Sequence, residues 1–248
     1  MATLLLTEEV MFKRRFAYSA ALVLAIFGVA LIATAIPAQA DSFTFTSCHI
    51  TGGCTEPASF GTVTLNQSGT SVNVDVALSN GNKFVETGAG ADAFFLFNAT
   101  AGMTVSNIIA TFNGADVTAA LGGMTYTFVP PPGAHADGTG DLTGLIECTV
   151  GANCNGGSGQ QVVNDLHFTV TNATLAQLET ANGSGNLFVA DILCGPTQAG
   201  CTGGLTGPVD VSTPGVVPEP TTLLLVGTAL AGLGGAWRRR RSQRALAV

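Results

Sequence analysis

The sequence predicts an all-β protein, specifically an antiparallel β-sandwich with jelly-roll-like topology. Polar and apolar residues alternate in short runs, most clearly over 71–78 (SVNVDVAL), which is typical of strands with one buried face. Turn-forming clusters rich in Gly, Asn and Pro separate these runs. Eight or nine short strands at this spacing favour a sandwich over other β architectures.

The predicted elements follow in order along one extracytoplasmic domain at 41–212. Residues 62–65 and 71–78 should form a hairpin, because the intervening 67–70 (QSGT) has turn chemistry. Residues 173–180 should form one short helical turn with Leu175 and Leu178 on the same face. The remaining predicted strands are 42–46, 84–86, 93–98, 105–112, 125–129, 162–172 and 186–193.

The N-terminus predicts a signal peptide at 1–40. Lys13, Arg14 and Arg15 precede the apolar stretch 20–36, as in the charged and apolar parts of a secretory signal. Ala38 and Ala40 flank Gln39 in the small-x-small pattern that signal peptidase recognises, so we expect cleavage before Asp41. Met11 would begin a more ordinary signal peptide than Met1, and it is therefore expected as an alternative start that leaves out 1–10.

The C-terminus has the composition of a membrane anchor. After the linker 213–217 and the tripeptide Pro218, Glu219, Pro220 comes the uncharged apolar run 221–237, at the short end of what crosses a bilayer core. The positive-inside rule keeps the basic cluster behind it in the cytoplasm. We therefore predict a transmembrane helix at 221–237. A basic stop follows it: Arg238, Arg239, Arg240 and Arg241.

This order of parts over 218–248 resembles the PEP-CTERM sorting signal of Gram-negative bacteria. In that family exosortase, a membrane-embedded processing enzyme, recognises a Pro-Glu-Pro motif, one membrane helix and a basic tail. The resemblance implies that Pro218, Glu219 and Pro220 are the sorting motif. It also implies two processing partners, exosortase and signal peptidase, and a route from the inner membrane to the periplasm, cell surface or extracellular matrix. More loosely, 42–212 looks like the β-rich domains found ahead of such signals, which implies association with the envelope or its exopolysaccharide.

The charge balance of the mature region argues against nucleic acid as a partner. Between residues 41 and 217, Lys83 is the only lysine or arginine, against 13 acidic residues. Binding nucleic acid or an anionic membrane surface requires lysines or arginines that displace counterions. We therefore expect contact with a membrane only through the C-terminal helix.

Cysteine usage indicates an oxidising compartment. All six cysteines fall within the exported region, in close pairs whose short loops are rich in Gly, Asn or Thr. Six cysteines allow fifteen connectivities, and a zinc site is an alternative, although these gaps are not those of zinc knuckles. Local disulfides are the simplest interpretation, and we expect them to tie surface loops more than the core. The pairs are Cys48 with Cys54, Cys148 with Cys154, and Cys194 with Cys201.

Catalytic and metal-binding patterns are scarce. His49, His135 and His167 do not belong to any nucleophile elbow, metalloprotease helix or phosphate loop, so we predict neither catalytic residues nor a cofactor. Asp137 and Asp141 flank Gly-Thr-Gly and are a calcium candidate, because Ca²⁺ takes carboxylate and backbone oxygens from flexible loops. The alternative is an ordinary Asp/Gly turn.

The aromatic inventory bears on function. Tyr126 is the only tyrosine between residues 41 and 217, and the single tryptophan, Trp237, lies in the predicted membrane segment. Because carbohydrate-binding sandwiches usually present exposed Trp or Tyr rings, this inventory does not favour a sugar-binding face. The leading hypothesis is a non-enzymatic exported protein of the cell surface or exopolysaccharide matrix. The alternatives are a carbohydrate- or calcium-binding module and a secreted hydrolase.

Overall fold

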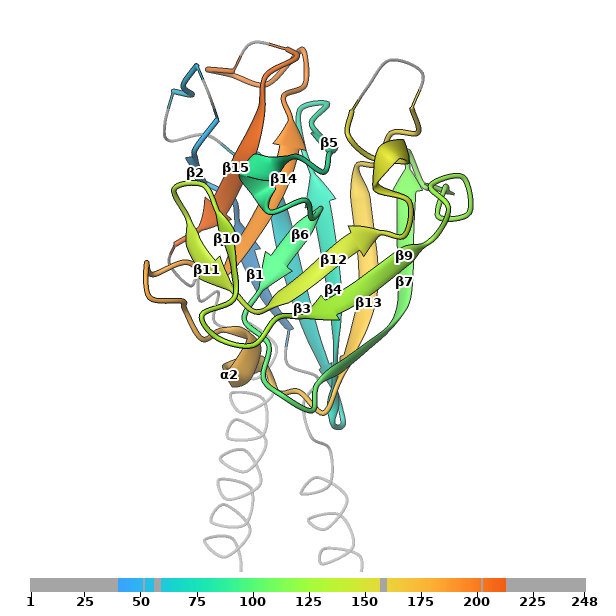
Figure 1. The fold of residues 1–248 in the computed structure, drawn as a ribbon, viewed down its shortest axis with the longest axis vertical. Helices are drawn as coiled ribbons and strands as arrows, with labels where there is room; N and C mark the ends of the chain where they lie inside the picture. Colours follow the sequence, from blue (N-terminus) through green and yellow to red (C-terminus); the bar gives the residue numbers. More distant parts are fainter. Residues whose placement is uncertain (1–39, 51, 56–58, 157–159, 202, 213–248) are drawn as a thin grey trace, which may run out of the picture. The chain divides into compact units, whose positions relative to one another are not determined.

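Two antiparallel β-sheets lie face to face in the computed structural model (Figure 1). This confirms the predicted all-β sandwich, while the finer jelly-roll-like topology stays a prediction. Within the described residues, no helix combines the length and apolar character needed to cross a bilayer. The signal peptide apart from Ala40, the linker, the sorting signal and the predicted transmembrane helix lie outside those residues. The structure describes residues 40–50, 52–55, 59–156, 160–201 and 203–212.

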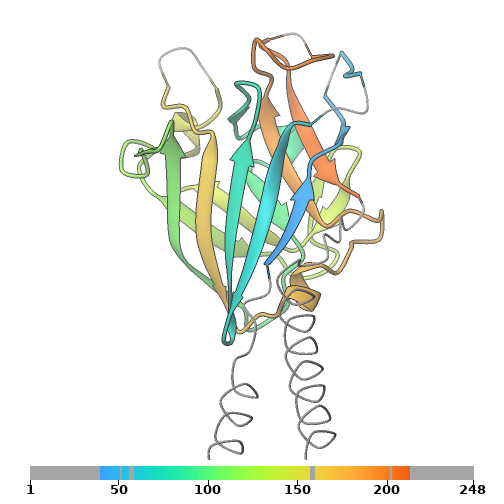
Figure 2. The same cartoon turned by 180° about the vertical axis from the view of Figure 1, so that it is seen from behind.

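The first sheet buries one face and exposes the other. Along its second and third strands every other side chain is buried, which matches the alternation read from the sequence. Figure 2 shows this sheet in front. Its strands, in spatial order, are β1 (Ala40–Thr44), β3 (Gly61–Ser68), β4 (Ser71–Leu78), β13 (Asp165–Thr171), β7 (Thr104–Phe112) and β8 (Ala115–Asp116).

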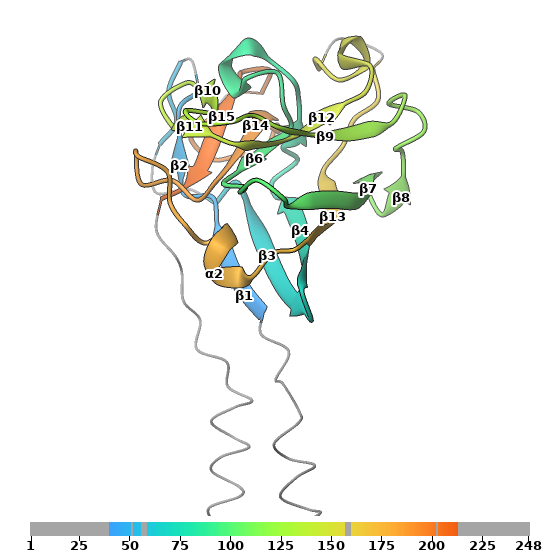
Figure 3. The same cartoon turned by 60° about the horizontal axis from the view of Figure 1, so that its bottom comes forward.

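The second sheet packs across the core from the first, as the edge-on view of Figure 3 shows. Its spatial order is β2 (Ser47–Cys48), β15 (Thr206–Val211), β14 (Phe188–Leu193), β6 (Phe95–Phe97), β12 (Gly144–Cys148) and β9 (Met124–Phe128). A further short strand, β5 (Lys83–Phe84), pairs with β14.

Unlike the first sheet, the second is mostly buried on both faces, except at its edge strand β9, where Thr125 and Thr127 are exposed. A separate hairpin of β10 (Ala134–Ala136) and β11 (Gly140–Leu142) and the 3-10 turn η1 (Gly88–Gly90) cover its outer face. A small apolar cluster forms there from Leu96, Leu145 and Val189 of the sheet and Ala136 and Leu142 of the hairpin. This explains why the chain reads as continuous apolar runs at β6 and β14, where a half-exposed strand would alternate.

Phenylalanine rings fill the space between the sheets. Phe168 of the first sheet contacts Phe95 and Phe97 of the second, with ring centroids 5.9 and 5.8 Å apart. Phe43 at the first sheet's edge meets Phe188 at 5.4 Å. All five rings are buried. These five rings therefore form the centre of the core between the sheets.

Elements with clear alternation were predicted well. The run 71–78 coincides with β4, and its hairpin with β3 is confirmed. The predicted helical turn contains α2 (Leu175–Leu178), which buries both of its leucines and has a capping box between Thr174 and Gln177.

Six strands were missed: β2, β8, β10, β11, β12 and β15. β15 carries Gly207 and Pro208, which are residues typical of turns. In the structure Pro208 nevertheless lies within the strand and pairs with Asp191. β12 lies in the doubly covered sheet, so its residues show no alternation. The other four are two or three residues long, too short to leave a periodic signal.

The aromatic contact between the sheets yields a stability prediction. Phe168→Ala should lower the free energy of unfolding of the oxidised domain by about 3–5 kcal/mol, because it removes a buried ring and leaves a cavity. Ile109→Ala is the control on the neighbouring strand, since Ile109 is 39 % exposed and should cost less than about 1 kcal/mol. Urea unfolding followed by circular dichroism measures both. Equal losses in the two variants would contradict the assigned core.

Candidate functional site

A groove of about 580 Å³ lies between β7 and β9. Figure 3 shows these two strands, one from each sheet, at the same side of the sandwich. The volume of the groove is within the range of small-ligand sites. Among the described residues that line it, none is charged. Met124 and the ring of Tyr126 contribute apolar surface. Hydroxyl and amide side chains provide the polar surface: Thr104, Ser106, Asn107, Thr118 and Thr125.

Both strands beside the groove are edge strands there. β9 ends the second sheet, and β7 pairs with β8 only through Thr111 and Phe112, so 104–109 has no strand partner on that side in the described part. β7 also contains a bulge, because its pairing with β13 shifts register between His167 and Thr169. Asn107 in this bulge has a left-handed φ of 53°, which asparagine tolerates better than most residues.

Tyr126 links the groove to the core. Its ring stacks on Phe97 with centroids 6.1 Å apart. Its hydroxyl is screened from solvent and has no hydrogen-bond partner within the described structure. Burial raises the pKa of this phenol, so it stays a neutral donor and acceptor near neutral pH.

A disulfide-closed loop supports the segment that leads into β9. The Thr149 N–H donates to the Gly123 carbonyl (2.9 Å), and the Asn153 amide donates to the Leu121 carbonyl (3.1 Å). Gly122 is required in this packing, since its φ is +86° and a Cβ there would approach Val150 to 2.8 Å. The loop between Cys148 and Cys154 therefore fixes one wall of the groove.

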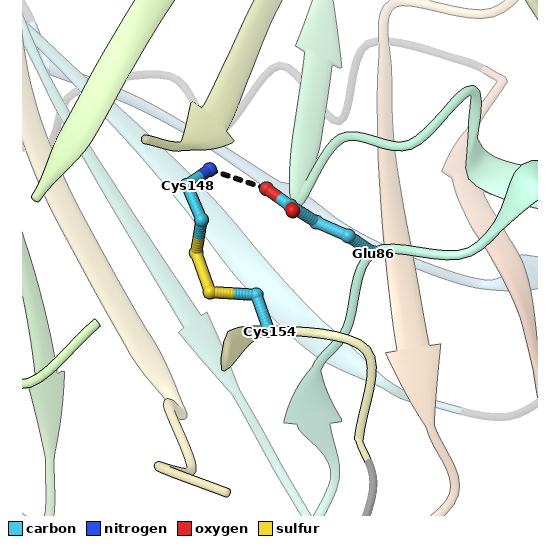
Figure 4. Close-up of side chains that lie close together, drawn as sticks. All are labelled: Glu86, Cys148 and Cys154. Atoms are coloured by element: carbon cyan, nitrogen blue, oxygen red, sulfur yellow. Dashed lines mark hydrogen bonds between the residues drawn. A yellow bond between two sulfur atoms is a disulfide. The ribbon is translucent and has the colours of Figure 1, made fainter. Parts of the chain in front are cut away.

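Glu86 holds this loop from inside the domain (Figure 4). Its carboxylate accepts the Cys148 N–H, and its own N–H donates to the Cys154 carbonyl at 2.8 Å. Glu86 is only 7 % exposed, and desolvation raises its pKa to about 7, although the hydrogen bond from Cys148 opposes the shift. Nearby negative charges on Glu147, Asp92 and Asp191 add to the rise.

Glu86, Cys148 and Cys154 are also the only group of three potential metal ligands found among the described residues. The two sulfurs are joined to each other, as Figure 4 shows, so neither is the thiolate that a metal requires. The geometry therefore assigns this group a structural role, and it offers no support for the zinc alternative.

The three local cysteine pairs predicted from the sequence are present. Their Cα–Cα distances are 6.5 Å for Cys48–Cys54, 6.5 Å for Cys148–Cys154 and 6.1 Å for Cys194–Cys201. The expectation that they tie surface loops more than the core was wrong for two of them. Both cysteines of the second and third pairs are buried and belong to the main apolar cluster, so these disulfides are also core packing.

The calcium candidate lies at the turn of the β10–β11 hairpin. Asp141 pairs with His135, its Oδ1 lying 2.7 Å from Nδ1, and the Asp137 N–H donates to the Ala89 carbonyl at 2.8 Å. This arrangement resembles an ordinary Asp/Gly turn that docks the hairpin on η1. Calcium binding here stays a prediction.

Besides Glu86, two further buried acids were missed at the sequence level. Asp191 on β14 is fully buried, and its Oδ2 accepts the Thr87 N–H (2.8 Å) and hydroxyl (2.6 Å). Desolvation raises the pKa of Asp191 to about 7. Asp210 on β15 is also buried and lies 2.8 Å from His49 Nε2. Asp191 and Glu86 each directly follow apolar residues within a strand-like run, which was the available signal.

The other predicted site residues lie in or beside the part that the structure leaves out. Ala40 begins β1, where it pairs with Asn66, so cleavage before Asp41 would leave nearly all of that strand. Ala38 lies outside the described residues. So do the sorting motif and the basic stop: Pro218, Glu219, Pro220, Arg238, Arg239, Arg240 and Arg241.

Comparison with known proteins bears on the C-terminus alone. Residues 216–241 match the PEP-CTERM protein-sorting motif family, which agrees with the resemblance noted from Pro218, Glu219 and Pro220. No curated protein and no solved structure matches the chain significantly.

The raised pKa of Glu86 predicts how stability depends on pH. Its carboxyl holds a proton in the folded state up to about pH 7 but releases it near 4.5 when unfolded. The stability of the oxidised domain should therefore fall as pH rises from about 5 to about 8. Glu86→Gln keeps an acceptor for Cys148 and should fall less over this range. Urea midpoints at each pH measure the difference.

Asp116→Asn is the control for that series. Asp116 is exposed, and hydrogen bonds from Thr118 lower its pKa, so this change should leave the slope between about pH 5 and about pH 8 as in the wild type. Parallel pH profiles for wild type and Glu86→Gln would show that Glu86 is not the titrating group.

Proposed function

We propose that this PEP-CTERM protein is a non-enzymatic component of the cell surface or exopolysaccharide matrix. The sorting motif at 216–241 carries the proposal, because it implies an exported protein that exosortase processes. The motif follows closely on the β-domain, whose last described residue is 212, so the domain is the part that export delivers.

The chemistry of the domain supports an oxidising destination. Three disulfides occur in it, and such bonds persist in the periplasm and outside the cell but seldom in the cytoplasm. The 13 acids and single lysine between residues 41 and 217 also favour a domain that does not adhere to anionic lipid.

The roles of the buried acids support a function without catalysis. Glu86 binds backbone groups of a disulfide loop, and Asp191 binds Thr87 beneath η1, so each carboxylate is engaged in holding the fold. Neither Glu86 nor Asp191 is among the residues that line the uncharged groove between β7 and β9. This arrangement suits a binding or structural protein better than an enzyme that uses acid–base catalysis.

A single substitution tests the sorting step. Glu219→Ala in a host that carries exosortase should leave a larger precursor in the membrane fraction, because the only charged side chain of the tripeptide Pro218-Glu219-Pro220 is lost. Thr213→Ala, three residues before the matched segment, is the matched control and should be processed like the wild type. Immunoblots of membrane, periplasmic and medium fractions give the readout. Identical migration and fractionation of Glu219→Ala and wild type would refute sorting through this motif.

A further inference from the structure

We propose that the groove between β7 and β9 binds a neutral, hydroxyl-rich ligand, such as a short stretch of an uncharged polysaccharide. The site goes beyond the sorting function, and it can be tested on the purified domain without reference to export. Its residues come from two sheet edges and from the segment between β8 and β9, which the loop closed by Cys148–Cys154 supports through hydrogen bonds.

The lining of the groove selects the chemical class of ligand. Hydroxyl and amide side chains both donate and accept hydrogen bonds, which is what sugar hydroxyls require. Ser106, Asn107 and Thr125 are exposed and therefore accessible to a ligand, whereas the Thr104 hydroxyl already bonds Thr171 and the Thr118 hydroxyl bonds Ala110. A charged ligand would lose hydration here without meeting an opposite charge, because none of the described residues that line the groove is charged.

Tyr126 contributes its ring to the groove rather than its hydroxyl. The hydroxyl has less than 1 Å² exposed to solvent, so a ligand in the groove does not reach it. The apolar surface of the Tyr126 ring and of Met124 lies in the same lining, where it can pack against the apolar face of a sugar ring.

The bulge in β7 argues against the other ligand that sheet edges attract, an extended peptide. Strand addition needs a regular ladder of backbone donors and acceptors. Asn107 interrupts that ladder, since the register with β13 shifts across it, and bulges are a known means of blocking edge-to-edge pairing. The bulge instead turns the Asn107 amide into the lining of the groove.

The supporting loop gives the site rigidity. Thr149 and Asn153 bind the backbone of Gly123 and Leu121, and Cys148 Sγ lies 3.8 Å from Met124 Sδ. A wall fixed in this way loses little conformational freedom when a ligand binds, which favours useful affinity from a few hydrogen bonds.

Affinity gel electrophoresis of the oxidised domain, residues 41–217, tests the proposal with named probes. Dextran and galactomannan are the neutral polysaccharides, alginate is the anionic one, and a short alternating Thr-Val peptide is titrated separately by calorimetry. We expect retardation by at least one neutral polysaccharide and no response to alginate or peptide.

Three variants locate the binding. Ser106→Arg places a long charged side chain in the groove and should weaken binding by at least about tenfold. Asn107→Gly keeps the left-handed backbone but removes the amide, and should weaken it about threefold. Tyr126→Phe should leave binding unchanged and the unliganded domain at least as stable, because it removes a hydroxyl that is screened from solvent and has no partner among the described residues, while the ring remains. Ala176→Arg on exposed α2 is the charge-matched control and should bind like the wild type.

Each other result overturns the proposal. If the wild type binds neither dextran nor galactomannan, or binds only alginate or the peptide, the ligand class is wrong. Neutral binding that Ser106→Arg leaves intact would place the site elsewhere. None of these results depends on whether Glu219 directs sorting.

Discussion

Contact between the phenylalanine rings of the two sheets is the constraint on which the rest of the domain depends. Phe168 meets Phe95 and Phe97 across the interior, and its strand β13 pairs with both β4 and β7. A one-residue slip in β13 would turn this ring outward and break pairing on both sides, so the contact fixes the register of the first sheet. Phe97 in turn stacks on the ring of Tyr126, which also lines the groove.

The disulfides stabilise loops that the aromatic contacts do not reach. Aromatic packing orders the middle of the strands, whereas the segments that join β9 and β12 to their neighbours are loops. Glu86 and the Cys148–Cys154 bond hold one such loop, and that loop holds the backbone before β9. This arrangement buries the carboxyl of Glu86, so the stability of the domain falls as pH rises from about 5 to about 8. Core, loop and groove wall thus form one chain of contacts.

Sequence reasoning succeeded where one physical signal dominated. β4 alternates because one face is wet, and local cysteine pairs need only short loops, so both were predicted correctly. β12 and β15 escaped because the second sheet is covered on both faces, which removes alternation, and Pro208 reads as a turn. The groove also escaped, because it forms where the edges of two sheets approach each other, and it uses hydroxyls and an amide in place of the exposed Trp or Tyr rings sought for sugar binding. The sequence around Glu86 does not identify its hydrogen-bond partner, because Cys148 lies 62 residues away.

The intact mass of the protein from a host that carries exosortase tests the central claim, that a disulfide-bonded domain is delivered and released through the C-terminal motif. We predict a form that begins at Asp41, lacks the residues beyond the Pro218-Glu219-Pro220 motif, and gains six hydrogens on reduction of its three disulfides. A mass that still includes Trp237 and the arginines would contradict release and indicate a domain that remains anchored. A mass unchanged by reduction would contradict the disulfide-bonded domain itself.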